Sequence, residues 1–293
     1  MFLPIKKNVN LSFMNKVNFI KMNGAGNDFI LISQSENPEF YPNVNLVREL
    51  CNRRKGIGAD GLLFIKENKY FDFELEYYNC DGSLGSLCGN GARCSIKFAI
   101  DFLNLNANQT EFLCNNSVYK GEKTDFDNIK FHFNKINQLK TNQKLVLGEN
   151  EIKFHFVENG SPHAVIFWND INNLCEENFD NFDIQYLGKC IRFNDYFNPG
   201  GANVNFIHIE NNNYKIRTYE RGVEEETFAC GTGTVASAII MNLIYGINSP
   251  ISIKTKDNDI LTVDFVKKNE NFEKINLTGP AKINYIGTYN FQK

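Results

Sequence analysis

The stretch "FACGTGTVASAII" (residues 228–240) places a cysteine directly before a Gly-x-Gly turn, and a long apolar run follows it. Glycines at the start of a helix leave backbone N–H groups uncovered, and these groups bind anions. The chain repeats the arrangement at "SLCGNGARCSIKFAI" (residues 86–100). Cys88 and Cys230 therefore share one setting, and each predicts a buried helix behind it, over residues 90–102 and 232–245.

The similarity extends upstream of the two cysteines. In "LEYYNCDGSLGSLCGNG" (75–91) and "IRTYERGVEEETFACGTG" (216–233), an alternating strand ending in tyrosine leads through a turn to Cys-Gly-x-Gly. The cysteines lie 142 positions apart in a chain of 293 residues. Repetition at about half the chain length indicates a duplicated domain, with many strands and one central helix in each half.

The repeat predicts two halves of similar size. We expect an N-terminal half over 14–134, completed by 277–293, and a C-terminal half over 135–276. The polar stretch 134–144 is predicted to link them. Residues 1–13 are expected to be an extension that precedes a natural start at Met14.

Strand signals dominate the rest of the chain. Residues 71–78, "FDFELEYY", alternate apolar and acidic side chains with the period of two that is typical of a half-buried strand. The same pattern predicts strands at 129–133, 151–157, 203–209, 214–219, 251–255 and 260–265.

The composition indicates a globular protein, with 42% hydrophobic residues, 22% charged residues and a formal net charge of -3 at pH 7. The sequence has no long basic block, which argues against a nucleic-acid surface. It has no apolar run of the roughly 18 residues that a membrane helix needs, and no recognisable signal peptide. We therefore expect a cytoplasmic protein that binds neither nucleic acid nor membranes.

Eight cysteines are too few and too scattered for a disulfide framework, so we expect free thiols in a reducing compartment. The spacing of Cys80, Cys88 and Cys94 fits no zinc template, and no metal site is predicted. Cysteine is among the most buried residue types, so packing is the expected role of those outside the repeated motif. These are Cys51, Cys80, Cys94, Cys114, Cys175 and Cys190.

A thiol at a helix N-terminus is expected to lose its proton more readily than a free thiol, whose pKa is about 8.5. The same N–H groups would hold a carboxylate. If the two helix ends faced one another, one thiolate would remove the α-proton of an amino acid while the other thiol delivered a proton to the opposite face. This is the chemistry of a racemase or epimerase without a cofactor, and the N–H groups would stabilise the charge that develops on the carboxylate.

The glycines also admit other interpretations. Gly231, Gly233 and Ala236 match the G-x-G-x-x-A fingerprint of dinucleotide-binding folds. The preceding segment, "GVEEETFAC" (222–230), is acidic and does not resemble a buried parallel strand, which argues against that fold. Residues 23–29, "NGAGNDF", resemble a phosphate-binding loop but lack its Gly-Lys-Ser/Thr ending.

Taken together, the motifs resemble one family, diaminopimelate epimerase, the pyridoxal-independent enzymes of bacterial lysine and peptidoglycan-precursor synthesis. The resemblance implies an α+β fold of two pseudo-symmetric domains, each a curved, antiparallel-rich sheet wrapped around a central helix, with the active site in the cleft between them. It also implies a homodimer without a cofactor. The matching stretches are, in the family's order, "KMNGAGNDF" (21–29), "NRRKGIGADGLL" (52–63), "NCDGSLGSLCGNGARC" (79–94), "GSPHAV" (160–165), "NPGGANVNF" (198–206), "YERGVEEETFACGTG" (219–233) and "LTGPA" (277–281).

The resemblance further implies a role for each matching residue. Cys88 and Cys230 would be the acid/base pair that interconverts LL- and meso-2,6-diaminopimelate, while His163 and Glu220 would tune proton transfer beside the thiols. Arg221 suits the distal carboxylate, because its planar guanidinium can bind a carboxylate with two bonds. The remaining matches fall on substrate-binding positions: Asn27, Asn79, Gly89, Asn90, Ser161, Asn203, Glu220, Gly231 and Thr232.

Two positions depart from the family's pattern. Ser161 stands where an asparagine is frequent, and Gly61 stands where many members carry glutamine, so both changes affect substrate binding rather than proton transfer. Two other functions stay open: a related proline or hydroxyproline racemase-type enzyme, and a binding protein whose facing thiols sense redox state. Arg221 argues against the first, because proline has no distal carboxylate.

Overall fold

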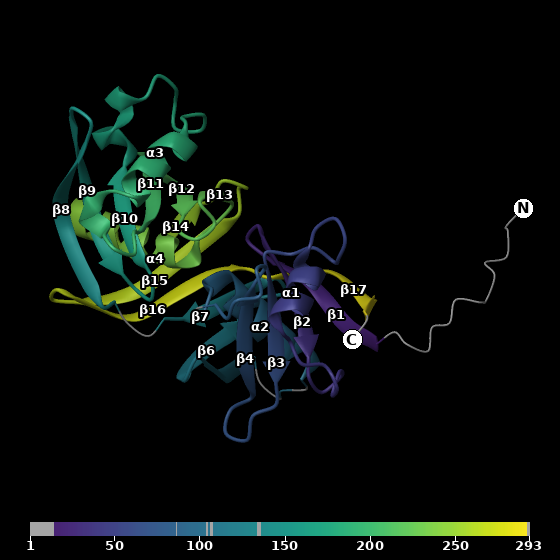
Figure 1. Cartoon of the computed structure of the whole chain (residues 1–293). Coiled ribbons are helices and arrows are strands. Elements are labelled where there is room, and N and C mark those ends of the chain that lie inside the picture. The colour runs from purple at the N-terminus through teal and green to yellow at the C-terminus, as the bar shows by residue number, and fades with distance from the viewer. Residues whose placement is uncertain (1–14, 86, 104, 106–107, 134–135, 292–293) are drawn as a thin grey trace, which may run out of the picture.

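The structure is a computed structural model that describes all residues except 1–14, 86, 104, 106–107, 134–135 and 292–293. The predicted extension at 1–13 and the start at Met14 lie outside the described residues. Figure 1 shows two lobes joined by a long strand, β16 (Asn271–Pro280), which pairs with a strand of each lobe. This sheet-dominated α+β architecture confirms the predicted fold class.

The N-terminal lobe is a sheet that surrounds the helix α2 (Gly89–Phe102), and a second helix, α1 (Val44–Cys51), lies outside it. The residues from Gly89 to Ala99 are all buried, because α2 packs against apolar side chains of several strands. These strands are β1 (Asn15–Gly24), β2 (Asn27–Ser33), β3 (Gly61–Lys66), β4 (Phe73–Asn79), β5 (Gln109–Cys114), β6 (Ser117–Lys123), β7 (Asn128–His132) and β17 (Lys282–Phe291), which returns to pair with β1.

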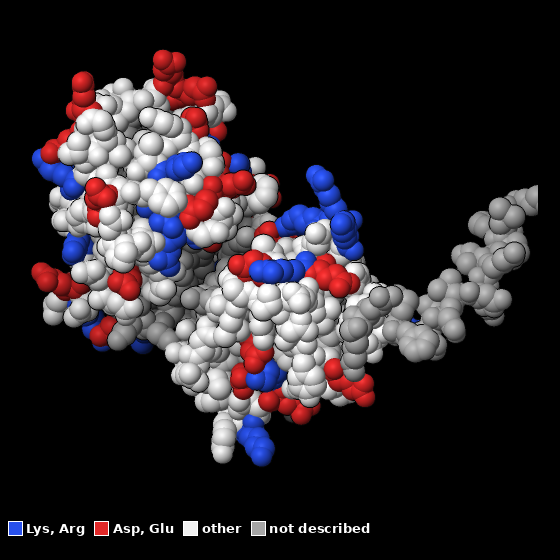
Figure 2. All heavy atoms as spheres, in the orientation of Figure 1, with Lys and Arg blue, Asp and Glu red and all other residues white. Residues whose placement is uncertain are grey.

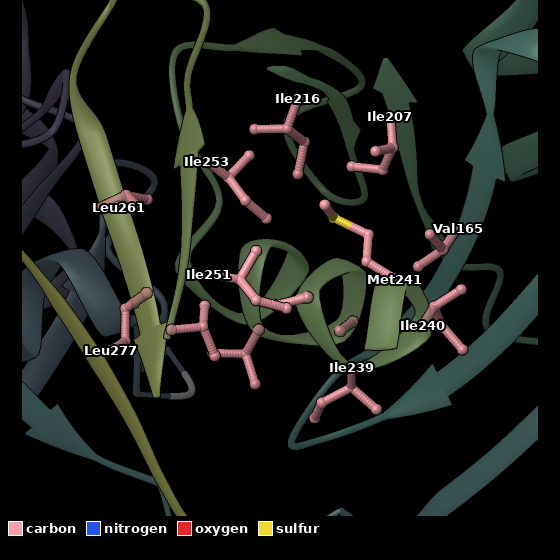
Figure 3. Close-up of a cluster of buried hydrophobic side chains, with 14 of the residues drawn as sticks. Val165, Ile207, Ile216, Ile239, Ile240, Met241, Ile251, Ile253, Leu261 and Leu277 are labelled. Carbon is pink, nitrogen blue, oxygen red and sulfur yellow. The ribbon is translucent and has the colours of Figure 1, made fainter. Parts of the chain in front are cut away.

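The C-terminal lobe is built in the same way around α4 (Gly231–Tyr245). Figure 3 shows Ile239, Ile240 and Met241 of α4 within a shell of aliphatic side chains from the surrounding strands. The outer helix is α3 (Ile184–Arg192). The strands of this lobe are β8 (Gln138–Leu147), β9 (Asn150–Glu158), β10 (Pro162–Phe167), β11 (Asn203–Glu210), β12 (Asn213–Glu220), β13 (Glu225–Thr227), β14 (Ile251–Lys254) and β15 (Ile260–Lys268).

The two lobes repeat one order of strand pairing. In the N-terminal lobe β1 pairs antiparallel with β2, β2 parallel with β3, β3 antiparallel with β4, and β4 parallel with β5. In the C-terminal lobe the same sequence of pairings joins β9, β10, β11, β12 and β14. The central helix follows the fourth strand in each case, so both helices begin at the corresponding edge of their lobes.

Both central helices were predicted to within one residue at the N-terminus, but other elements differ from the sequence analysis. The described part of the expected linker, 136–144, contains the first seven residues of β8. This is an edge strand whose polar side chains point to solvent and whose backbone pairs with β9. The helices α1 and α3 were not predicted. Each is short and amphipathic. The side chain of Asn43 caps α1 and that of Asp183 caps α3, and each accepts a hydrogen bond from a backbone N–H of the first turn.

Acidic and basic side chains are interspersed over the face shown in Figure 2, where the two lobes meet along a furrow. Within the described part of the chain, no helix is both long enough and apolar enough to cross a membrane. All eight cysteines are free. Cys51, Cys94 and Cys114 are buried as expected. Cys80, in the turn after β4, is exposed, and Cys175 and Cys190 are partly exposed, with Cys190 inside the outer helix α3.

Candidate active site

The two helix ends that the sequence singled out meet at the junction of the lobes. A Cβ atom placed on Gly231 would lie 3.5 Å from Cα of Gly89, and a Cβ atom on Gly89 would lie 3.7 Å from Cα of Gly231. Each glycine is the first residue of its helix, and Cys88 and Cys230 are the extended N-cap residues immediately before them. The structure therefore brings both thiols and both sets of helix N–H groups to one place.

The thiols are less acidic than their position at helix ends suggests. Burial raises the pKa of Cys88 and the neighbouring Glu220 carboxylate raises it further, while N–H groups of Gly91 and Asn90 lower it by less. Burial and Glu220 likewise raise the pKa of Cys230 above the usual range. The Thr232 hydroxyl, whose oxygen lies 3.5 Å from the sulfur, lowers this pKa by less. The expectation of readily ionised thiols is thus wrong for the free protein, because desolvation outweighs the helix ends.

Glu220 is the charged group that both thiols share. It ends β12, and although the residue is partly exposed, its Oε2 atom is buried with no hydrogen-bond partner among the described residues. Burial raises the pKa of this carboxyl to about 6, the Thr227 hydroxyl opposes the shift, and Asp60 of the other lobe adds to it. A buried carboxylate oxygen without a partner is a suitable acceptor for a substrate ammonium group.

His163 is buried at the start of β10 and is held by Asn205, a residue that the sequence analysis missed. The Asn205 amide donates to the Ala164 carbonyl at 3.1 Å and lies 3.2 Å from Nδ1 of His163, and its Oδ1 accepts from Thr218. Nδ1 must therefore accept, which leaves the proton on Nε2, an atom without a partner within the described chain. Burial, with Arg221 nearby, lowers the pKa of His163 to about 3, so the ring is a neutral donor.

Asn27 and Asn90 belong to a hydrogen-bond chain that crosses the junction. Asp60 accepts from Asn27 Nδ2 at 3.0 Å, Asn90 Nδ2 donates to Asn27 Oδ1, and the same amide donates to the carbonyl of Ala229 in the other lobe at 3.1 Å. The side chain of Asn90 thus joins the lobes. Its predicted role in substrate binding rests on its backbone N–H alone, because every polar atom of its amide is already used.

Arg93 supports this chain from inside α2, and the sequence analysis missed it as well. Its guanidinium is fully buried and donates to Asn90 Oδ1 at 2.9 Å, to the Gly89 carbonyl at 3.3 Å and to the Pro280 carbonyl at 3.4 Å. All three acceptors are neutral. The sequence signal that could have identified Arg93 is its positive charge within the otherwise mostly apolar helical run.

Arg221 follows Glu220 directly and is partly exposed. Asn203 Oδ1 accepts from the backbone N–H of Arg221 at 2.9 Å, and Asn203 Nδ2 donates to the Pro162 carbonyl at 3.1 Å. Asn203 thus ties the backbone of Arg221 to that of Pro162. The guanidinium has no hydrogen bond or ion pair within the part of the chain that the structure describes. Arg221 lines a cavity of about 290 Å³ whose other lining residues all belong to the C-terminal lobe. An unpartnered guanidinium beside a cavity is suited to a carboxylate.

The other predicted positions lie at the rim of the junction. Asn79 ends β4, and its amide donates to the Ser83 hydroxyl at 3.0 Å, which leaves its Oδ1 available. Ser161 lies in the turn before His163 and is partly exposed. The segment before Cys230 includes only the three-residue β13, paired antiparallel with β12, so the dinucleotide fingerprint has no parallel strand before it.

Comparisons with known proteins identify the family to which the chain is similar. The sequence profile of the family described as "Diaminopimelate epimerase" matches residues 19–116 and 155–283. A diaminopimelate epimerase of Chlorobaculum tepidum is 38% identical over 270 residues, covering 91% of this chain and 99% of its own. Another, from Flavobacterium psychrophilum, is 37% identical over 265 residues, covering 89% and 96%.

Solved structures share the fold at much lower sequence identity. A hydroxyproline epimerase from Agrobacterium vitis, with bound trans-4-hydroxy-L-proline, has a TM-score of 0.69 and 11% identity over 95% of this chain and 93% of its own. A phenazine biosynthesis protein of the PhzF family from Bacillus anthracis has the same TM-score and identity, over 96% of this chain and 100% of its own. At this identity, the likeness concerns the fold alone.

Proposed function

The chain belongs to the diaminopimelate epimerase family, and from this premise we propose that Cys88 and Cys230 move the α-proton that separates LL- from meso-2,6-diaminopimelate. Membership makes the protein an isomerase that epimerises an amino acid. The observation that carries the residue assignment is the contact between Gly89 and Gly231, which places the two thiols at one junction.

The abutting helix ends provide the site for the reacting carboxylate. The first N–H groups of α2 and α4 have no partner inside their helices, and they would donate to the carboxylate next to the α-carbon. As the α-proton leaves, negative charge moves onto that carboxylate, and these N–H groups stabilise it. One sulfur breaks the C–H bond and takes the proton, while the S–H of the other breaks as its proton bonds to carbon from the opposite face.

Glu220 links substrate binding to thiol ionisation. In the free protein its charge raises the pKa of both thiols. An ammonium group bound at the unpartnered Oε2 would neutralise that charge and place a cation near the sulfurs, which lowers the free energy of the thiolate. The base would therefore form only when a substrate is present, and proton transfer by the thiols requires no pyridoxal phosphate.

Arg221 gives the site its preference for a second carboxylate. Its guanidinium has the free donors for a two-bonded contact, and its backbone is fixed by Asn203. A proline racemase would not use Arg221, because a proline has no distal carboxylate. A redox sensor would need thiols that oxidise readily, whereas thiols with raised pKa are slow to oxidise. Both alternatives are therefore less favoured than epimerisation of diaminopimelate.

Three further parts of the proposal stay predictions. They are the division into 14–134 with 277–293 and 135–276, a homodimer, and a cytoplasmic location. The homodimer can be checked by sedimentation of the purified protein at micromolar concentration.

The activity is tested by proton NMR of the reduced protein with LL-diaminopimelate in D₂O, without added pyridoxal phosphate. Loss of the α-proton signal together with formation of the meso isomer is the expected result. If all eight thiols are reduced and neither change occurs, diaminopimelate is not the substrate.

A further inference from the structure

Gly61 and Gly85 lie against the two edges of one aromatic ring, that of Tyr77. A Cβ atom on Gly61 would lie 2.6 Å from Cε2 of Tyr77 and 3.2 Å from its hydroxyl oxygen. A Cβ atom on Gly85 would lie 2.6 Å from Cδ1 and Cε1 of the same ring. Phe29 meets the ring edge-on at 6.2 Å, so the orientation of Tyr77 is fixed on three sides. Gly61 lacks a side chain because Tyr77 occupies the space.

The hydroxyl group of Tyr77 lies beside Gly61, the residue after Asp60, and Asp60 accepts from Asn27 in the hydrogen-bond chain that crosses the junction. Tyr77 is partly exposed. Burial raises the pKa of this hydroxyl well above the ordinary value, and Cys88, Glu220 and Asp60 nearby add to the shift, so the hydroxyl is neutral at working pH. These neighbours come from both lobes, and two of them belong to the proposed site.

The adjacent tyrosine provides a contrast within the same strand. Successive residues of β4 point to opposite faces of the sheet. Tyr78 packs in the cluster on the other face with Val47 and Phe64, and its hydroxyl donates to Glu76 at 2.8 Å. Tyr77 packs on the α2 side, against Phe29 and Leu63, and keeps its hydroxyl free. Only one of the two tyrosines therefore has a polar group available to a substrate.

We propose that the Tyr77 hydroxyl is a specificity-determining group that binds an ammonium group of the substrate. The inference rests on the proposed function. Gly61 has no side chain to bind substrate, and the Tyr77 hydroxyl beside it would supply a polar contact there. The Glu220 carboxylate favours a cation here, and the phenol oxygen can accept a hydrogen bond from the same ammonium group that the unpartnered Oε2 of Glu220 would bind. Two acceptors from opposite lobes would hold that ammonium when the lobes are together.

The test compares Tyr77→Phe with Tyr78→Phe in the full-length, reduced protein. Tyr77→Phe removes one hydrogen bond to a charged group, so KM for LL-diaminopimelate should rise roughly tenfold or more while kcat stays within about threefold of the wild-type value. Tyr78→Phe should leave both constants unchanged, because its hydroxyl lies outside the site. Thermal unfolding of both variants shows whether either change acts through stability.

The outcomes separate the role of Tyr77 from the proposed function. Turnover by the wild type and by Tyr78→Phe, with an unchanged KM in Tyr77→Phe, would overturn the role of Tyr77 alone. A lower Tm and lower kcat in Tyr77→Phe with the wild-type KM would assign it a structural role and also overturn the inference. Absence of turnover in the wild type would overturn both, since the substrate itself would be wrong.

Discussion

At the residue scale, we expect the activity to depend on the charge of Glu220. Its carboxyl has a pKa of about 6 and must be ionised to bind an ammonium group, so the active form is lost as the pH falls through that value. We expect kcat/KM to be constant above about pH 7 and to fall about tenfold per unit well below pH 6. Glu220→Gln should abolish this acidic limb and lower the plateau by one to two orders of magnitude, as a pH series of initial rates would show.

Glu225→Gln is the matched control, because Glu225 is an exposed neighbour on β13. It should retain the acidic limb. A limb that persists unchanged in Glu220→Gln would assign the titration to another group.

Arg93 is the residue whose loss should cost the most stability. Replacement by methionine leaves Asn90 Oδ1 and the Pro280 carbonyl without the guanidinium donor, and each unsatisfied group costs about 1–3 kcal/mol. We expect the free energy of unfolding to fall by about 3 kcal/mol or more in urea denaturation. Arg53→Met, at a side chain that is 58% exposed, should cost at most about 1 kcal/mol. Equal losses in the two variants would contradict this account.

At the scale of elements, the start of α4 depends on close contact with β11. A Cβ atom on Gly233 would lie 2.2 Å from Asn205 Oδ1, the amide that fixes His163. Gly233→Ala should therefore displace Asn205 and lower the Tm by several degrees. At Gly200 the nearest atom to an added Cβ is the end of a flexible arginine at 3.6 Å, so Gly200→Ala should unfold within about 2 °C of the wild type. A Tm of Gly233→Ala equal to that of Gly200→Ala would show that α4 adjusts without cost.

The elements that the sequence predicted are those with a local signal. The helices after Cys88 and Cys230 begin where expected, because a glycine followed by an apolar run favours a helix start through residues close in sequence. The raised thiol pKa could not be predicted, since it arises from burial by both lobes. The roles of Asn205 and Tyr77 depend on contacts between separate strands, and no pattern within one strand indicates them.

At the scale of the whole molecule, the two lobes are already interlocked. Ala25, at the tip of the turn between β1 and β2, is fully buried and packs in the apolar cluster of the C-terminal lobe. The amide of Asn90 bonds across the same junction to Ala229. We therefore expect substrate to enter by separation of the lobes. Cys230 is buried until that occurs, whereas Cys88 is partly exposed.

This shielding predicts the order of alkylation by iodoacetamide. Cys80 is exposed, whereas Cys230 is 8% exposed and its thiol pKa is raised. We expect Cys80 to be modified at least tenfold faster than Cys230 at pH 8, as followed by mass spectrometry of peptides from partially labelled protein. Labelling of Cys230 at the rate of Cys80 would show that the lobes are open in solution.

The central claim is that two thiols on opposite faces of one carbon invert its configuration, and the single cysteine variants test it most directly. Cys88→Ala and Cys230→Ala should be incubated separately with LL-diaminopimelate in D₂O, and formation of the meso isomer measured beside the wild type. The account predicts that each variant loses at least about three orders of magnitude in epimerisation rate, because one-face chemistry cannot invert a centre. Substantial conversion to meso-diaminopimelate by either variant would contradict it.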